Sequence, residues 1–464
     1  KLIQALVKAL RHIKDKNAGQ GLALGLLPTV FKDISFAANA VDILPSPYYK
    51  TALSIFNWLC AHQRKDGSIL DPNVSSTLDA QYHHANMGLG GVVLFLLNGG
   101  DEYYERAYRA LKYYSDVPPE RKGGGVDFSN FPFLVSYMLL HDRAGQCKLK
   151  DLLKRCVDGM THHADMEKGA TYGNNFVTFR ALNHLLRFMI LGEGKDRELA
   201  GDFMGHSLKW QFDDGVFYDF PRSFNDKKGI PSLAYHSKIT LITLLYGLVD
   251  GDKHVIERAM AGLEAMIKLT ANDGEAFYYG RTNNALYGYA CGILALRAAS
   301  NHLEKGRLAE SFKACETALF RFCSGHGAKD GHLHIVPNGL EDERCGFDNY
   351  MYVTVYNAFT MSMLLLSTLI RDTVSPAGST TAGVHYFKDS GFIIKKSDRI
   401  SVAFNLKGHN YYEQYLLDPR FTCATPLFVK YGASDVLPAI PFSCPHQAAK
   451  AESPIKKIRR KIGE

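Results

Sequence analysis

The sequence predicts a mainly α-helical protein that folds as an (α/α) toroid of about six helical hairpins, followed by a smaller antiparallel β module. Three observations lead to this fold class. Asp-Gly turns recur along the chain, two kinds of helix alternate between the turns, and short β-rich segments occur only toward the C-terminal end. The 464 residues suffice for one large helical domain and a second, smaller element.

Asp-Gly pairs mark the ends of repeating units. They occur at 66–67, 214–215, 273–274 and 330–331. The long interval between the first two pairs holds two further glycine-rich breaks, at 123–125 and near 172–173. The chain therefore divides into about six units, each long enough for two helices and their connections, and this period is typical of a helical array.

Helices of two kinds lie between these turns. One kind is amphipathic, as in 49–62 and 101–114, where apolar residues form a single stripe. The other kind is apolar nearly all round, as in 80–97 and 232–249, which indicates helices packed on both sides. Six such pairs closed into a double ring would surround a cleft with the leading ends of the inner helices.

The pattern changes after Pro376. Short β-rich segments follow at 383–387, 391–396, 400–406 and 428–431. We therefore expect a toroid over residues 1–375 and an antiparallel β module over residues 383–445. Residues 446–464 are expected to form a basic, flexible tail.

Charge and composition exclude several function classes. Five basic side chains and one carboxylate among residues 455–464 account for most of the net charge of +7, so the rest of the chain does not indicate a nucleic-acid partner. The longest apolar run, 88–97, is about half of the ~18 residues that span a bilayer. The nine cysteines form no CxxC pair, which argues against a zinc site and for buried free thiols.

Polar and aromatic side chains follow the turns, in phase with the repeat. The six clusters occupy 81–86, 127–130, 172–175, 235–236, 277–284 and 348–352. In a toroid all six would converge on one face. Aromatic rings stack on sugars, while Asn, His and Arg bond to hydroxyls and carboxylates, so the pattern predicts a carbohydrate-binding cleft. Taken singly, the clusters also fit structural roles, such as a helix cap at Asn174-Asn175.

Four motifs, in their order along the chain, resemble a known enzyme group. They are Tyr-Gly-Asn-Asn (172–175), Asp-Asp-Gly-Val-Phe-Tyr (213–218), Ala-Tyr-His (234–236) and Tyr-Gly-Arg (279–281). This order, over about residues 50–410, resembles the toroid polysaccharide lyases: chondroitin and hyaluronate lyases, heparinase II/III-like enzymes and oligo-alginate lyases. The resemblance implies β-elimination on a uronic-acid polysaccharide without a metal or organic cofactor. For location, we expect a secreted or periplasmic protein whose signal peptide lies outside this numbering; a protein that never had a leader is the alternative.

The resemblance assigns roles to three residues. Asn175 would bind and neutralise the uronate carboxylate, Tyr235 would carry the proton, and Arg281 would hold tyrosine and substrate in position. A cation near Tyr235 would favour its phenolate form, and an amide donor would stabilise the enolate as it forms. The residues expected to bind substrate are His84, Asn86, Asn130, Asn174, Tyr218, Tyr279, Asn284 and Tyr350.

The chain departs from the group's pattern at its histidines. The histidine that precedes the catalytic tyrosine in those enzymes is absent, and residues 224–226 read Phe-Asn-Asp instead. The Asn-Asn-His run of some alginate lyases ends here in Phe176. His236, which we include among the catalytic candidates, could fill the role, as could His84 or His409.

Two other functions remain open from the sequence. A glycoside hydrolase needs two carboxylates across the cleft. Asp213, Asp214 and Asp219 on one loop, with Asp127 or Asp348 on others, could supply them, although an Asp-Asp-Gly run also fits a simple turn. A carbohydrate-binding toroid without catalysis is the third possibility.

Overall fold

The structure is a computed structural model that describes twelve parts of the chain. They are residues 44–140, 147–161, 173–219, 231–278, 285–337, 344, 351–370, 374–376, 381–397, 400–406, 426–431 and 434–437. The expected basic tail, residues 446–464, lies outside them. None of the helices in these parts is long and apolar enough to cross a membrane.

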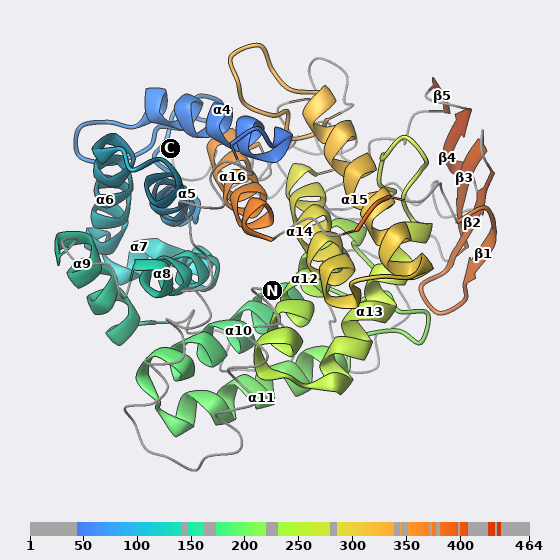
Figure 1. Ribbon diagram of the computed structural model, residues 1–464, viewed down its shortest axis with the longest axis horizontal. Helices are drawn as coiled ribbons and strands as arrows, with labels where there is room; N and C mark the ends of the chain where they lie inside the picture. Colours follow the sequence, from blue (N-terminus) through green and yellow to red (C-terminus); the bar gives the residue numbers. More distant parts are fainter. Residues whose placement is uncertain are drawn as a thin grey trace, which may run out of the picture.

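Twelve helices form six pairs arranged as a double ring (Figure 1). The inner helices are α5 (His83–Asn98), α8 (Val126–Leu140), α10 (Asn174–Leu191), α12 (Leu233–Asp250), α14 (Leu286–Leu303) and α16 (Val353–Leu369). The outer helices are α4 (Pro47–His62), α6 (Asp101–Asp116), α9 (Cys147–Asp158), α11 (Gly194–Leu208), α13 (Lys253–Lys268) and α15 (Arg307–Gly325). Each inner helix contacts the next, and α16 contacts α5, so the ring closes. The short helix α7 (Pro119–Lys122) and the 3-10 turn η1 (Gly123–Gly125) lead into α8.

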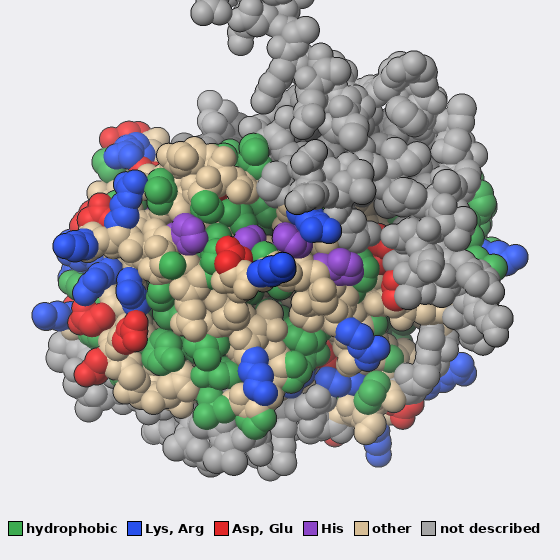
Figure 2. All heavy atoms as spheres, turned by 90° about the horizontal axis from the view of Figure 1, so that it is seen from above, with side chains coloured by type: hydrophobic (Ala, Val, Ile, Leu, Met, Phe, Trp, Pro, Cys, Tyr) green, Lys and Arg blue, Asp and Glu red, His purple; other side chains and the backbone are tan. Residues whose placement is uncertain are grey.

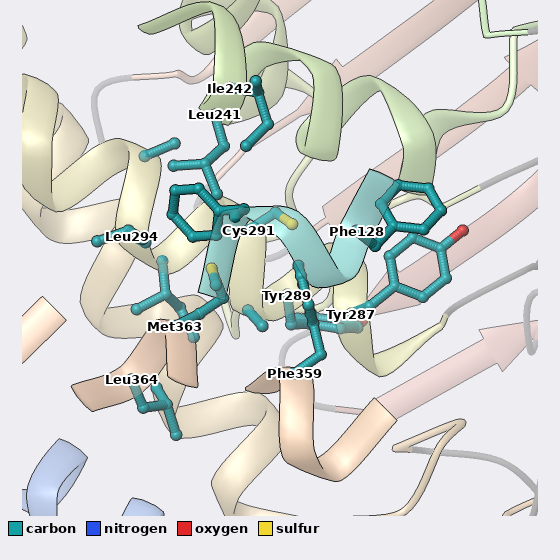
Figure 3. Packing of buried hydrophobic residues seen from close by; sticks show 14 of the residues in the cluster. Phe128, Leu241, Ile242, Tyr287, Tyr289, Cys291, Leu294, Phe359, Met363 and Leu364 are labelled. Carbon is teal, nitrogen blue, oxygen red and sulfur yellow. The ribbon is translucent and has the colours of Figure 1, made fainter. Parts of the chain in front are cut away.

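The inner helices supply most of the core. Nearly every residue of α12, α14 and α16 is buried, whereas α6 and α13 bury a single face. Figure 3 shows side chains from four inner helices meeting in the centre of the ring, among them Phe128, Leu241, Tyr289 and Met363. Free thiols are found at Cys60, Cys156, Cys291, Cys315 and Cys323. The inner helices are therefore apolar nearly all round because they are packed on both sides, as the sequence predicted.

The Asp-Gly turns share one geometry. All four glycines, at 67, 215, 274 and 331, have φ between +89° and +104°. They also press on the backbone or side chain of a neighbouring outer helix, and a Cβ added at Gly274 would lie 2.0 Å from the Ala318 carbonyl oxygen. Glycine is required here both for its backbone conformation and for its small size.

Each of these turns is tied to the following inner helix by the same kind of bond. The backbone N–H of the third residue after the turn aspartate donates to a side chain on that helix. The four bonds are Ile69 to His84 Nε2 (3.0 Å), Phe217 to His236 Nδ1 (3.0 Å), Ala276 to Tyr289 Oη (3.2 Å) and Leu333 to Asn357 Oδ1 (2.8 Å). We call these four acceptor side chains the turn anchors.

The ends of the ring are joined across more than 270 residues of sequence. Asp71 Oδ2, in the turn before α5, accepts bonds from the backbone N–H (2.8 Å) and the hydroxyl (2.7 Å) of Thr354 in α16. Trp58 in α4 donates through Nε1 to Asp330 Oδ2 at 2.9 Å, in the last Asp-Gly turn. These bonds make the first and last hairpins neighbours.

A five-stranded antiparallel sheet follows the ring. Its strands, in spatial order, are β1 (Gly383–Phe387), β2 (Phe392–Lys396), β3 (Ile400–Asn405), β4 (Pro426–Tyr431) and β5 (Ser434–Leu437). The sheet lies at the edge of the ring, beside α13 and α15 (Figure 1). Phe392 packs edge-on against Phe277, with the ring centroids 5.5 Å apart. The predicted fold class, a toroid followed by a small antiparallel β module, is confirmed.

Candidate functional site

The inner helices begin on one face of the ring, which we call the N-terminal face. Contacts between helix starts and the preceding loops show this: Asp219, before α12, binds the first turn of α10, and Ile335, before α16, accepts a bond from Leu286 at the start of α14. This is the face on which the sequence predicts the polar clusters. Four of the predicted site residues, Arg281, Tyr279, Asn284 and Tyr350, lie outside the described residues, as do Asp348 and His409.

Aromatic rings from five inner-helix starts gather around one lysine. Lys238, in the second turn of α12, is buried, and its Nζ lies 4.3 Å from the ring centroid of Tyr287 and 4.6 Å from that of Phe128. The centroids of Tyr235, Phe359 and Tyr82 lie 5.2, 5.4 and 5.8 Å away. Cation–π attraction stabilises a cation in such a cage.

Tyr235 is part of this cage. Its ring lies 5.3 Å from that of Tyr287, and the residue is 7% exposed. The sequence interpretation assigned the neighbouring cation to Arg281, whereas the structure brings the ammonium group of Lys238 to the ring. Lys238 was missed, although a lysine three residues after Tyr235 in an otherwise apolar helix was a visible signal.

Asn175 is held by a carboxylate. Its Nδ2 donates to Asp219 Oδ1 at 2.6 Å, and its backbone N–H donates to the same oxygen at 3.1 Å. Its own Oδ1 is buried and has no hydrogen-bond partner among the described residues. A uronate carboxylate bound through this amide would lie close to the Asp219 carboxylate, and like charges at that distance repel. The contact therefore argues against the predicted role of Asn175.

Asp219 anchors the start of α10 more broadly. Its carbonyl oxygen accepts a bond from the Asn174 N–H at 2.5 Å, while Asn174 Nδ2 donates to the Ser207 carbonyl at 3.3 Å. A carboxylate at a helix N-terminus satisfies free N–H groups and interacts favourably with the helix dipole. Asp219 is 1% exposed. From the sequence we expected it only as one of several carboxylates that a hydrolase could use.

His236 and His84 are turn anchors. His236 accepts through Nδ1 from Phe217 and bonds through Nε2 to the Gly262 carbonyl at 3.1 Å, so the backbone engages both ring nitrogens. Burial lowers the pKa of His236 to about 4 and holds that of His84 well below its usual value. The bonds and burial support structural roles for both histidines, and their assistance to Tyr235 stays a prediction.

Three predicted substrate-binding residues also contact the protein. Asn86 donates to the Tyr82 carbonyl at 2.9 Å, and Asn130 donates to the Thr161 carbonyl at 2.9 Å. Asn130 also lines a cavity of about 270 Å³ between α6, α8 and α9. Tyr218 is buried, with its ring 5.9 Å from that of Phe212. These contacts are structural, whereas Asn86 Oδ1 is buried with no hydrogen-bond partner among the described residues; the substrate-binding role of the three residues stays a prediction.

The carboxylates proposed for a hydrolase separate into different environments. Asp214 Oδ1 accepts from the Val216 N–H at 3.3 Å, which makes it a turn residue. Asp213 is exposed and lines a groove of about 730 Å³ between α13 and β1. Asp127, in the first turn of α8, pairs with Arg180 at 3.3 Å. Of the three on the 213–219 loop, only Asp219 reaches the N-terminal face.

A histidine-rich surface lies at one side of the molecule (Figure 2). Around the last Asp-Gly turn, the rings of His62 and His332 lie 4.3 and 4.7 Å from that of Trp58, and His332 Nδ1 lies 2.6 Å from Asp330. Within the described ranges, no group of three or more His, Cys, Asp or Glu side chains could hold a metal ion.

Comparisons with known proteins give the fold. No family model matches the chain, and no curated protein matches it. Among solved structures, a cellobiose 2-epimerase from Bacillus thermoamylovorans B4167 is similar with a TM-score of 0.50 and 8% identity, over 67% of this chain and 95% of that chain.

Two other solved structures are similar at lower scores. An inactive variant of the α-1,6-mannanase GH76A from Salegentibacter sp. HEL1_6 has a TM-score of 0.48 and 14% identity, over 69% of this chain and 99% of that chain. A possible GH105 member from Salmonella enterica has a TM-score of 0.49 and 13% identity, over 69% and 92%. At these identities the likeness extends to the fold alone: the chain is an (α/α) toroid.

Proposed function

We propose that this protein is a carbohydrate-active enzyme that hydrolyses a glycosidic bond at the N-terminal face, with Asp219 as one of its two carboxylates. The observation that carries the proposal is the contact between Asp219 and Asn175. It fixes the buried carboxylate of Asp219 at the start of an inner helix, and it uses the amide of Asn175 as a donor to that carboxylate. A carboxylate in that position suits acid–base or nucleophilic work on a glycosidic bond.

Two further features support a carbohydrate as the substrate. Aromatic side chains, the residue type on which sugar rings stack, gather at the starts of the inner helices around Lys238. The likeness to a cellobiose 2-epimerase makes sugars the first substrates to test. The buried Oδ1 of Asn175 is a hydrogen-bond acceptor that suits a sugar hydroxyl better than a carboxylate.

The second carboxylate is Asp127 or Asp348. Asp127 starts the neighbouring helix α8, where its ion pair with Arg180 fixes its orientation. Asp348, the other candidate, lies outside the described residues. Replacing each by asparagine distinguishes them, because only the catalytic one should abolish turnover in a folded protein.

A specific observation favours a second candidate function, β-elimination by Tyr235. The ammonium group of Lys238, 5.2 Å from the Tyr235 ring centroid, would favour a phenolate that removes the proton next to a uronate carboxylate. In this mechanism Lys238 is the cation that favours the phenolate, a part for which the sequence offered Arg281.

One assay separates the two functions. The protein is incubated with neutral and uronic-acid polysaccharides while reducing ends and ultraviolet absorbance are recorded. New reducing ends without absorbance indicate hydrolysis, whereas absorbance from a conjugated 4,5-double bond indicates elimination and overturns the hydrolase proposal. Binding without either signal across the panel would support the non-catalytic alternative.

Asp219→Asn then tests the assigned residue. The amide keeps the shape and one acceptor oxygen for Asn175, so the fold should persist while kcat falls by ~10²–10⁴-fold. Asp213→Asn is the matched control, because that side chain is exposed on the same loop and should leave kcat unchanged. Equal activity in both variants would remove Asp219 from the mechanism.

A further inference from the structure

The β module binds the second Asp-Gly turn through one partly buried carboxylate oxygen of Asp214. Asp214 Oδ2 accepts three bonds from the turn between β1 and β2: from the Asp389 N–H at 3.1 Å, the Ser390 N–H at 2.8 Å and the Ser390 hydroxyl at 2.6 Å. Ser390 is fully buried. Hydrogen bonds to a charged, partly buried oxygen are stronger than neutral ones, so the contact is well suited to fix the turn.

The turn continues directly into the residue assigned to the site. Residues 210–218 form a small hairpin, in which the Tyr218 N–H donates to the Trp210 carbonyl at 2.8 Å and the Phe212 N–H donates to the Val216 carbonyl at 2.9 Å. Asp214 is at its tip, and Asp219 follows its second arm. A displacement of the tip is therefore transmitted along a short, hydrogen-bonded arm to Asp219.

The module holds the next turn in the same way. Lys396, buried in β2, donates to the Ile267 carbonyl at 3.1 Å and to the Thr270 carbonyl, at the end of α13. Asn272 donates to the Ser397 carbonyl at 2.7 Å. Two successive turns that lead to the N-terminal face are thus bonded to the module.

We propose that Ser390 is a positioning residue for the site: through Asp214 it fixes the arm that holds Asp219 against the first turn of α10. The inference rests on the proposed function for its catalytic consequence. Its structural part, the coupling from Ser390 to α10, stands on the bonds alone. The β module is then a support of the site rather than an independent domain.

Hydrogen exchange measures the coupling without any substrate. The Asn174 and Asn175 amides donate to Asp219, so their exchange reports how firmly Asp219 is held. Ser390→Ala should speed their exchange about tenfold while the β2 and β3 amides keep their protection. Ser401→Ala is the matched control, since this buried serine of β3 has no bond to Asp214 and should change neither.

The double variant shows whether Ser390 acts through Asp214. Asp214→Ala and Ser390→Ala should each speed exchange at Asn175, and together they should do no more than Asp214→Ala alone. Additive effects, or unchanged exchange in Ser390→Ala, would overturn the proposal. Faster exchange throughout the β module would also do so, because it would mean that the serine only stabilises the sheet.

Kinetics measure the catalytic consequence separately. With a substrate from the polysaccharide assay, Ser390→Ala should lower kcat about tenfold and leave KM within twofold. The reason is that Asp219 shifts while the other residues of the N-terminal face stay in place. A change in KM alone would contradict a positioning role. If no carbohydrate is turned over, the proposed function fails while the exchange experiment still decides the coupling.

Discussion

At Asn175, one contact reverses the chemistry that the residue type suggests. An asparagine at the start of an inner helix is a good donor to a substrate carboxylate, and the sequence offers no reason to expect otherwise. The acceptor is Asp219, 44 positions away, which takes both the side-chain and backbone donors. The same asparagine then serves to orient a carboxylate, and this contact is the observation on which the proposed hydrolysis rests.

Tyr235→Phe removes only a hydroxyl. If hydrolysis depends on Asp219, the variant should keep kcat within about tenfold and lose ~0.5–1.5 kcal/mol of stability. Turnover on the preferred polysaccharide and the melting temperature are the two measurements. A drop in turnover of ~10²–10⁴-fold in a folded variant would instead identify Tyr235 as the proton carrier.

Buried histidines should make the fold sensitive to mild acid. Burial lowers the folded-state pKa of His83 and His236 to about 4, against an ordinary value of 6.5. Between these values the unfolded chain binds protons that the folded chain does not, so the free energy of unfolding should fall as the pH falls from 6.5 to 4. Urea unfolding across this range measures the slope.

His83→Phe supplies the control for that slope. His83 is fully buried, with its ring centroid 4.0 Å from that of His84, so phenylalanine keeps an aromatic ring in place and removes one titrating site. The variant should show a shallower acid slope than the parent. A steeper or unchanged slope would mean that other groups govern the acid response.

At the scale of elements, the turn anchors explain part of the repeat. His84, His236, Tyr289 and Asn357 differ in chemistry, yet each accepts the N–H of the third residue after a turn aspartate. Polar residues therefore recur in phase with the turns because the fold needs an acceptor there. Periodicity placed the polar clusters on one face of the ring but did not separate the turn anchors from residues available to a ligand.

Gly274→Ala should be much more costly than an ordinary glycine replacement. The residue has a φ of +97°, and its new Cβ would lie 2.0 Å from the Ala318 carbonyl oxygen, so strain and overlap add. We expect a loss of at least ~2–3 kcal/mol. Gly251→Ala is the matched control: its φ is +71°, but no atom lies within 4 Å, so it should cost about 1 kcal/mol. Similar losses in the two variants would show that packing against α15 is unimportant.

At the scale of the whole molecule, a few sequence-distant bonds close the ring. A repeat of hairpins alone does not state whether the array stays open or joins its ends. The bonds from Thr354 to Asp71 and from Trp58 to Asp330 connect the last units to the first. Closure places the starts of all the inner helices around one centre, which a linear array would not do.

Asp71→Ala tests the closure. It removes two buried bonds to Thr354 and leaves those donors unsatisfied, so the free energy of unfolding should fall by ~2–4 kcal/mol. Asp66→Ala is the control, because Asp66 is exposed and, within the described parts of the chain, bonds to nearby Ser68; it should cost less than ~1 kcal/mol. Chemical denaturation of both variants gives the comparison, and equal losses would contradict a special role for closure.

The repeat, the two kinds of helix and the change to β-strands were predictable from the sequence. Each depends on residue types within one helix or strand, or on the spacing of successive turns. Asp-Gly spacing, all-round apolar helices such as α12, and the short β-rich runs after Pro376 are each local signals. The face that carries the polar clusters followed from the repeat as well. No local signal, however, assigns a partner to a polar side chain.

The sequence by itself determined the toroid and the face on which its site is to be sought, since hydrophobic periodicity and turn chemistry act locally. Only the tertiary structure decided what the polar residues do. Asn175 donates to Asp219, and both ring nitrogens of His236 bond to the backbone. Asp214 accepts a hydrogen bond from Ser390, 176 positions away. A buried polar group takes its role from its hydrogen-bond partner, and these partners meet only when the chain closes on itself.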